Sequence, residues 1–257
     1  VYNKDRILYP MKRIGEKGSG QFERITWDEA FALISEKLLD IREKYGARST
    51  VFYAGYPKWY RPALLRLSNA YGSPNFCTES STCFQSANMA WKSIYGNDIC
   101  SPDMQNAKTV LLWTSNLYHS NTPMSQTYQN LQKKGVKIIV VDPRKTATTC
   151  EADIHLRIMP GTDGALALGM AHVIIEENLY DKEFVENYVY GFKEYCDYVK
   201  EFTPEKTAEI TGESPEKIIQ AARLYATNRP AGIMFSACIC VITEQHCLDS
   251  IILRFDN

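Results

Sequence analysis

The sequence lacks the long apolar runs, the charge excess and the disordered composition that mark several broad classes of protein. No stretch approaches the roughly 18 consecutive apolar residues that a membrane-spanning helix needs, so we expect no direct membrane insertion. The formal net charge of −1 gives no reason to expect nucleic acid as a partner. Hydrophobic residues make up 45% of the chain and charged residues 23%, a balance typical of a folded globular protein.

Metal-binding and disulfide motifs are also absent. The eight cysteines are scattered without a C-x-x-C pair, so we expect mostly free thiols. The four histidines lie apart along the chain, which leaves a zinc site unsupported. No G-x-G-x-x-G motif is present, and this disfavours an ordinary nicotinamide enzyme. The chain starts at Val1 without an initiator Met, so we expect it to continue a longer polypeptide whose compartment, cytoplasmic or periplasmic, stays open.

Residues 1–78 predict an N-terminal loop followed by part of an α/β domain. Thr26 and Glu29 form a capping-box pattern, and the apolar residues that follow at helical spacing predict a helix that Gly46 ends. The expected elements are an aperiodic segment over 1–22, helices over 27–45 and 62–71, a strand over 50–53 and an irregular stretch over 73–82.

Residues 79–257 alternate strands and helices and predict a dinucleotide-binding, Rossmann-like α/β domain. A strand, a helix and a second strand over 109–141 form one βαβ unit, which implies parallel strands joined by a right-handed crossover. The fold class we expect is α/β, with a doubly wound, mainly parallel sheet and helices on both faces. The expected strands are 109–113, 136–141, 155–158 and 232–242, and the expected helices are 84–95, 123–134, 164–177, 181–190, 193–200, 204–211 and 215–228.

Three groups of residues follow expected strands, at the edge where a parallel sheet binds ligands. An acid such as Asp142 at the tip of the second strand is placed to hold a ribose, and Arg144 can pair with a phosphate. The carboxylate of Asp163 can accept two hydrogen bonds from a guanine edge. Taken singly, each group is also common turn chemistry. The groups are Thr114, Ser115 and Asn116 after the first strand, Asp142, Pro143 and Arg144 after the second, and Gly161, Thr162 and Asp163 after the third.

These segments resemble the molybdopterin oxidoreductase family, which includes dimethyl sulfoxide reductases, formate dehydrogenases and periplasmic nitrate reductases. The matching stretches are 9–13 (YPMKR), 22–30 (FERITWDEA), 135–144 (GVKIIVVDPR) and, most specifically, 160–169 (PGTDGALALG). The resemblance extends to about residue 235, and 236–257 fit the family poorly. Where many relatives end the first strand in Gly, this chain has Trp113. The resemblance implies a molybdopterin guanine dinucleotide cofactor carrying Mo or W, with Asp163 holding the guanine.

The resemblance also implies a metal ligand. In the family, a Cys, selenocysteine or Ser ligand lies on a loop before a short helix that ends in Gly, and here Cys83 precedes a helix that Gly96 ends. A thiolate at a helix start is favoured by the helix dipole, and it suits a metal already held by dithiolenes. We therefore expect Cys83 to be the catalytic metal ligand, with Cys77 as the alternative.

By the same resemblance, the function is expected to be redox conversion of a small molecule with electron transfer. An iron–sulfur cluster is expected in an N-terminal region outside this sequence, and an iron–sulfur electron-transfer subunit is the expected partner. The 257-residue chain alone is expected to be inactive. Formate dehydrogenases have His after the metal ligand, whereas this chain has Phe84, which predicts a different substrate.

Two other functions stay open. The stretch 77–83 (CTESSTC) looks closer to tungsten hydratases, hydroxytransferases and catechol dehydroxylases of the same family than to nitrate reductases. A guanine-nucleotide-binding α/β module without catalysis is the second alternative.

Overall fold

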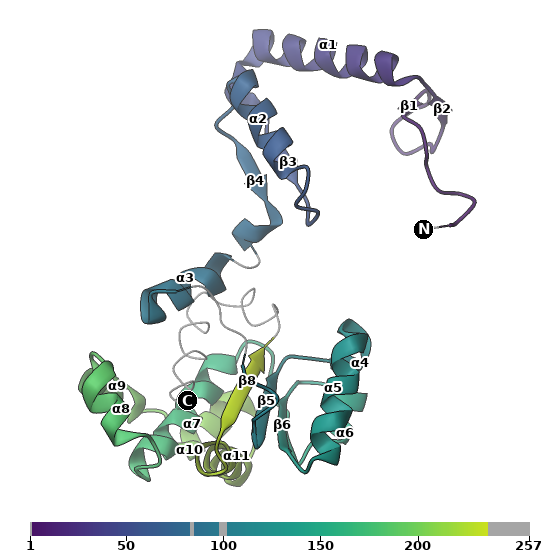
Figure 1. Cartoon of the computed structure of the whole chain (residues 1–257). Coiled ribbons are helices and arrows are strands. Elements are labelled where there is room, and N and C mark those ends of the chain that lie inside the picture. Colours follow the sequence, from purple (N-terminus) through teal and green to yellow (C-terminus); the bar gives the residue numbers. More distant parts are fainter. Residues whose placement is uncertain (1, 83–84, 98–101, 236–257) are drawn as a thin grey trace. The chain divides into compact units, whose positions relative to one another are not determined.

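The computed structural model describes residues 2–82, 85–97 and 102–235, and the chain divides into two compact units, Val1–Glu79 and Ser80–Asn257 (Figure 1). In the described part of the chain, no helix combines the length and apolar character that crossing a bilayer requires. The identification of the second unit as a dinucleotide-binding domain stays a prediction.

The first unit contains a small parallel pair of strands joined by a helix. Strand β3 pairs in parallel with β4, so that Phe52 lies opposite Phe76 and Ala54 opposite Thr78, with α2 between them in sequence. This arrangement is the expected part of a second α/β domain. Its elements are β1 (Met11–Arg13), β2 (Phe22–Arg24), α1 (Trp27–Tyr45), the 3₁₀ turn η1 (Ala47–Ser49), β3 (Phe52–Ala54), α2 (Arg61–Tyr71) and β4 (Phe76–Thr78).

Three of these strands were not anticipated. The segment 1–22, expected to be aperiodic, contains β1, and β1 pairs with β2 in an antiparallel hairpin. The stretch 73–82, expected to be irregular, contains β4 and the 3₁₀ turn η2 (Glu79–Thr82). Each strand is three residues long, too short for an alternating pattern to show, and its backbone partner rather than its own sequence makes it a strand.

The start of α1 confirms the capping box. The Thr26 Oγ1 accepts a hydrogen bond from the Glu29 N–H at 3.2 Å, and the Thr26 N–H donates to Glu29 Oε2 at 2.7 Å. The hydrogen bonds from the backbone and side chain of Thr26 lower the pKa of Glu29. At the other end, Gly46 has a φ of 80°, which favours glycine and ends the helix as predicted.

The second unit is built on a parallel sheet in the order β7-β6-β5-β8, as Figure 1 shows for β8, β5 and β6. The strands are β5 (Thr109–Trp113), β6 (Lys137–Val141), β7 (Ile154–Leu156) and β8 (Ala231–Phe235). The chain adds β6 and β7 on one side of β5 and β8 on the other, so the strand order reverses at β5. Ligands bind at such a reversal, beyond the carboxyl ends of the strands. The part of the predicted last strand beyond Phe235 lies outside the described residues.

Helices cover both faces of this sheet, as predicted. Leu111 and Trp113 pack in a cluster with α7 and α11, while Val110 and Leu112 pack in a second cluster with α4 and α5. The helices are α3 (Gln85–Tyr95), α4 (Leu117–Ser120), α5 (Thr122–Lys133), α6 (Ala147–Cys150), α7 (Asp163–Glu176), α8 (Lys182–Tyr188), α9 (Phe192–Val199), α10 (Pro204–Thr211) and α11 (Pro215–Thr227). Neither α4 nor α6 was expected, because four residues are too few to show a helical period.

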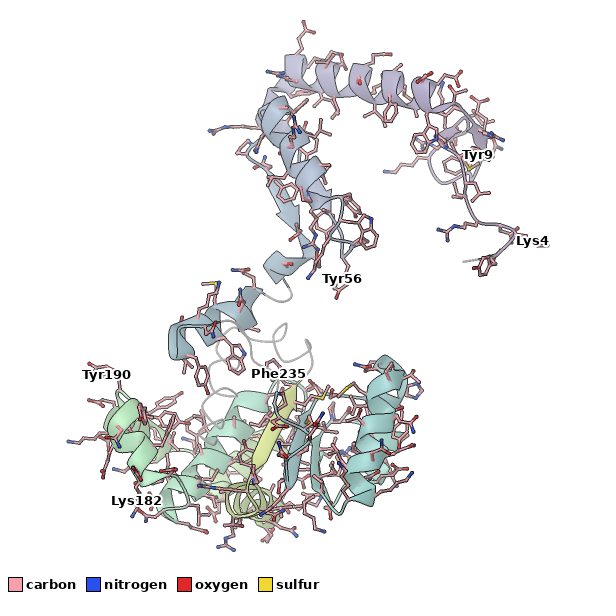
Figure 2. All side chains as sticks on the ribbon, in the orientation of Figure 1. Lys4, Tyr9, Tyr56, Lys182, Tyr190 and Phe235 are labelled. Carbon is pink, nitrogen blue, oxygen red and sulfur yellow. The ribbon has the colours of Figure 1, made fainter. Side chains whose placement is uncertain are left out.

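Two contacts fix helices of the second unit. The ring of Phe235, labelled in Figure 2 at the end of β8, stacks on Trp91 of α3 with centroids 6.3 Å apart. In α7, a Cβ added to Gly169 would lie 2.7 Å from Thr207 Cγ2 and 2.9 Å from Thr207 Cβ. Gly169, the last residue of the 160–169 (PGTDGALALG) stretch, therefore allows α7 and α10 to pack closely.

Candidate functional site

A cavity of about 650 Å³ lies at the carboxyl ends of β5 and β6. This volume is typical of sites that bind small molecules. Three of the predicted site residues contribute to it, Thr114 and Asn116 after β5 and Arg144 after β6. The described residues that line the cavity are Thr114, Asn116, His119, Ser120, Arg144, Lys145, Thr146 and Ala147.

The charge of this cavity favours an anion. Its described lining includes the cations Arg144 and Lys145 and no carboxylate. The side chain of Arg144 is 71% exposed, and its Nε lies 3.7 Å from Asp142 Oδ1. Because this guanidinium is exposed and only loosely paired, it remains able to form a bidentate pair with a phosphate.

Asp142 shapes the turn after β6 instead of lining the cavity. Its side chain is buried, and Oδ1 accepts a hydrogen bond from the backbone N–H of Arg144 at 2.8 Å. His155 Nε2 donates to the Asp142 carbonyl oxygen at 2.8 Å, and Arg157 Nε donates to the Pro143 carbonyl oxygen at 3.0 Å. These bonds hold the turn that presents Arg144 to the cavity. The predicted ribose contact of Asp142 stays a prediction.

The loop after β5 contains an unusual backbone conformation at Thr114. Its φ is 51°, in the left-handed region that favours glycine and that β-branched residues rarely adopt. Its Oγ1 is buried and has no hydrogen-bond partner among the described residues. The glycine-favouring backbone is therefore at Thr114, one residue after Trp113, the position at which many relatives have Gly. Strain of this kind is concentrated at functional sites.

Asn116 turns the same loop into α4. Its backbone carbonyl accepts hydrogen bonds from the Ser120 hydroxyl at 2.7 Å and from the Ser120 N–H at 2.9 Å. Its side-chain oxygen accepts from the Thr148 hydroxyl at 3.3 Å, which links the loop to α6. Ser115, between Thr114 and Asn116, is buried and is not among the residues that line the cavity.

Asp163 lies at the start of α7, away from the lining of the cavity but at the same edge of the sheet. The indole N–H of Trp113, the last residue of β5, donates to Asp163 Oδ1 at 2.8 Å. Trp113 is completely buried and Asp163 is 5% exposed. Because Thr114 directly follows Trp113, the end of β5 connects Asp163 to the cavity.

Gly161 and Thr162 form the turn that leads to Asp163. Gly161 has a φ of 87°, which requires the conformational freedom of glycine. The Thr162 hydroxyl donates to the Met159 carbonyl oxygen at 2.7 Å, so it closes the turn and does not cap α7. The structure thus separates the predicted residues into a cationic cavity and a buried carboxylate, joined by the end of β5.

The predicted metal ligand, Cys83, lies outside the described residues, as does Phe84. The alternative, Cys77, is a half-buried free thiol in β4, opposite Tyr53 in the register with β3. Cys150 and Cys196 are also free, in agreement with the expected free thiols. Within the described ranges, no group of three His, Cys, Asp or Glu residues is placed to hold a metal ion.

Sequence reasoning missed several residues of this site. Lys145 adjoins the predicted Arg144 and shares its charge, so the basic pair itself was a usable signal. His119 lies in the unexpected helix α4, and Thr146 caps the equally short α6 through its bond from the Thr149 N–H at 3.3 Å. The bond between Trp113 and Asp163 joins residues fifty positions apart and had no local signal.

A second cavity, of about 410 Å³, contains none of the predicted site residues. Its described lining is mainly aromatic and includes no charged side chain, in contrast to the cationic cavity. The lining residues are Ser93, Ile94, Tyr95, Phe184, Tyr188, Val189, Tyr190, Gly191, Phe192 and Tyr195.

Comparison with known proteins agrees with this architecture. Residues 6–245 match the model of the molybdopterin oxidoreductase family. Among curated proteins, acetylene hydratase of Syntrophotalea acetylenica is 40% identical over 90% of this chain and 32% of its own length. The molybdopterin-containing subunit of thiosulfate reductase from Salmonella typhimurium is 34% identical over 91% of this chain and 31% of its own length.

A solved structure also covers nearly the whole chain. Acetylene hydratase from Pelobacter acetylenicus superimposes with a TM-score of 0.83 at 36% identity, over 99% of this chain and 36% of that protein. The chain thus spans about a third of the length of the curated relatives it matches.

Proposed function

The chain belongs to the molybdopterin oxidoreductase family, and from this premise we propose that its second unit binds the guanine dinucleotide form of the cofactor. Membership implies a molybdopterin cofactor with molybdenum or tungsten. The observation that carries the guanine dinucleotide is the pairing of a cationic cavity with a buried carboxylate at one sheet edge.

The residues present fit the two polar parts of such a ligand. Arg144 and Lys145 supply positive charge without an opposing carboxylate in the described lining, which suits a diphosphate. Asp163 offers acceptor oxygens, which suit the N–H donors of guanine. Thr114, Ser115 and Asn116 follow Trp113, which bonds Asp163, and Thr114 and Asn116 line the cationic cavity. They would contact the ribose–phosphate backbone, with Gly161 and Thr162 shaping the guanine end.

For the reaction, the bound cofactor would supply the metal centre and its redox-active dithiolenes. The described residues would bind and orient it and place its charged groups. We propose that Cys83 ligates the metal, with Cys77 as the alternative, because Cys83 comes two residues before α3 in the sequence. The whole protein would then convert a small molecule with electron transfer, supplied through an iron–sulfur centre in another region or subunit.

A second activity is favoured by a specific observation. Both the curated relative that is 40% identical and the solved structure with a TM-score of 0.83 are acetylene hydratases. We therefore propose hydration of a small unsaturated substrate as a second candidate activity, beside redox conversion. A substrate panel on the purified holoenzyme separates them, with acetylene, catechols and sulfoxides beside formate and nitrate. Turnover of acetylene without consumption of an electron donor supports the hydratase, and efficient formate oxidation contradicts the expectation from Phe84.

The cofactor site itself is tested with guanosine diphosphate, which carries the base, ribose and diphosphate of the dinucleotide. Calorimetric titration of the apoprotein should give tighter binding of guanosine than of adenosine diphosphate. Asp163→Ala should weaken guanosine diphosphate binding by about tenfold or more, because a hydrogen bond to a charged group contributes about 1.5–3 kcal/mol.

A matched pair of charge reversals tests the cavity. Arg144→Glu with Lys145→Glu should abolish measurable binding, because it places acids against the diphosphate. Lys133→Glu with Lys134→Glu makes the same charge change on two adjacent exposed residues at the end of α5 and should leave binding unchanged. Equal losses in both pairs would reduce the effect to net charge and contradict the proposed site.

A further inference from the structure

The carboxylate of Asp163 is held from one side only. Oδ1 accepts the indole N–H of Trp113 at 2.8 Å, and both residues are more than nine-tenths buried. Among the described residues, no donor is paired with the other oxygen, Oδ2. Oδ2 is not one of the buried polar atoms that lack a partner, so it reaches solvent. The carboxylate is thus fixed through Oδ1, while Oδ2 and the second lone pair of Oδ1 are left for a ligand.

We propose that Trp113 is a positioning residue that sets the purine selectivity of the cofactor site by fixing the orientation of Asp163. The proposal rests on the proposed guanine site. An indole has a single N–H and no acceptor, so it can bind only an oxygen of residue 163. Because the carboxylate is already fixed, little rotational freedom is lost when guanine binds, and this preorganisation strengthens the contact.

The orientation also determines which base edge fits. Guanine presents the N1–H beside the exocyclic amine, and both groups are donors that a carboxylate accepts. In the arrangement we propose, Oδ2 faces the exocyclic amine, while Oδ1 accepts the N1–H beside its bond from Trp113. Adenine places an acceptor nitrogen at N1 and a C–H at C2, and its amine lies at C6, on the other side of N1. A fixed carboxylate therefore meets the N1 lone pair and finds no amine opposite Oδ2, so this edge is rejected.

An Asn at position 163 makes the role of Trp113 measurable. The indole can donate only to the amide oxygen, so Trp113 forces the amide nitrogen into the place of Oδ2. Xanthine presents an oxygen where guanine presents the exocyclic amine, and it keeps the N1–H. A fixed Asn therefore matches xanthine with both of its groups. Without the indole the amide can turn over, and the match is lost for part of the population.

The experiment measures binding of guanosine, inosine, xanthosine and adenosine diphosphates to the apoprotein and its variants. Trp113→Phe should weaken the binding of guanosine diphosphate about tenfold and reduce the ratio of its affinity to that of adenosine diphosphate. Asp163→Asn should reverse the preference from guanosine to xanthosine diphosphate. In the double variant, the preference for xanthosine diphosphate should shrink to about twofold or less, because the two residues act as a coupled pair.

Trp91→Phe is the matched control, because Trp91 is another buried indole of the second unit, 3% exposed, and packs on Phe235. It should leave the selectivity among the four nucleotides unchanged. A xanthosine preference that is equally strong with and without Trp113 would overturn the proposal.

If Trp113→Phe does not fold, the nucleotide preference of Asp163→Asn alone still tests the proposal. Absence of a preference for xanthosine diphosphate in that variant would mean that the amide is not fixed, which contradicts the role of Trp113. Failure of the underlying guanine site has a different signature, since the wild type and all variants would then bind guanosine and adenosine diphosphates alike.

Discussion

At the scale of single residues, Thr114 combines two unfavourable features, a left-handed backbone and a buried hydroxyl without a partner among the described residues. Left-handed φ costs a residue with a Cβ about 1–2 kcal/mol, and glycine avoids that cost. Thr114→Gly should therefore raise the free energy of unfolding by about 1 kcal/mol, after the greater chain entropy of glycine is subtracted. Urea denaturation measures the change.

The same substitution at Thr227, in the last turn of α11, is the control for this prediction. Its backbone is helical, so glycine there should lower the free energy of unfolding by about 0.5–1 kcal/mol. Equal losses at the two positions would mean that Thr114 carries no backbone strain.

A second residue-scale prediction concerns the metal. Cys83→Ala in the complete protein should abolish turnover and change the electronic spectrum of the metal while the pterin stays bound, because only the protein ligand is removed. Cys77→Ala is the matched control, because it removes another thiol six residues away, and it should leave turnover largely intact. If instead the Cys77 variant is inactive and the Cys83 variant active, the ligand assignment is reversed.

At the scale of elements, α7 illustrates a close helix contact. Ala is a better helix former than Gly by about 1 kcal/mol, so Gly169→Ala would stabilise an isolated α7. In the fold, the added methyl would overlap Thr207, and overpacking costs about 1–3 kcal/mol. We expect a net loss of up to about 2 kcal/mol in thermal or urea unfolding. The three overlapping atoms are Oγ1, Cγ2 and Cβ of Thr207. Thr207→Ala removes Oγ1 and Cγ2 and should make the effect of Gly169→Ala smaller.

Asp153, just before β7, bonds two residues of β6 and makes a pH-dependent contribution to the stability of the fold. Its carboxylate accepts hydrogen bonds from Lys137 Nζ at 2.6 Å and from the Ile138 N–H at 2.8 Å. Burial alone raises the pKa of Asp153, but the bonds from Lys137 and Ile138 outweigh it and leave the pKa below the ordinary value of 3.8. The stabilisation is therefore present above pH 3.8 and is lost as the pH falls through the lower, folded-state pKa.

Asp153→Asn should lower the free energy of unfolding at neutral pH by about 1 kcal/mol, a value limited by the partial exposure of the pair. The difference from the wild type should shrink as the pH falls below 3.8 and vanish below the folded-state pKa, and urea titrations across that range measure it. Asp40→Asn, which removes a surface partner of Lys44 on α1, is the control. A difference that persists unchanged into acid would contradict the role of the Asp153 charge.

The elements that could be predicted are those whose own sequence carries the signal. The helix after Thr26 has a capping box, and β5 and β6 are buried strands rich in branched residues, so their bounds agree with the structure to within one residue or so. β4 exists because β3 lies beside it, and α4 is a single turn fixed by hydrogen bonds to Asn116. Such elements depend on tertiary partners that no local pattern displays.

The same distinction applies to the candidate site. Arg144 was identifiable because charged residues at a strand end have a fixed position at the sheet edge. The left-handed φ of Thr114 and the hydrogen bond from Trp113 to Asp163 were not, since both arise from how β5 meets α7 and the neighbouring loop.

At the scale of the whole molecule, the chain spans about a third of the length of the relatives it matches. Large side chains on α1 are exposed, with Trp27 and Phe31 each at 60%. The substrate, the partner subunit and the choice between molybdenum and tungsten therefore belong to the complete protein. The proposed cofactor site at the sheet edge of the second unit is the part of that activity that these residues would explain.

The most direct test of this account is the content of the purified holoprotein. Acid denaturation followed by mass spectrometry, with metal analysis on the same sample, identifies what was bound. The account predicts guanosine monophosphate together with a pterin and molybdenum or tungsten. All three should be lost in the Arg144→Glu and Lys145→Glu variant and kept in the Lys133→Glu and Lys134→Glu control. A metal-bearing pterin released without any guanosine monophosphate would contradict the account.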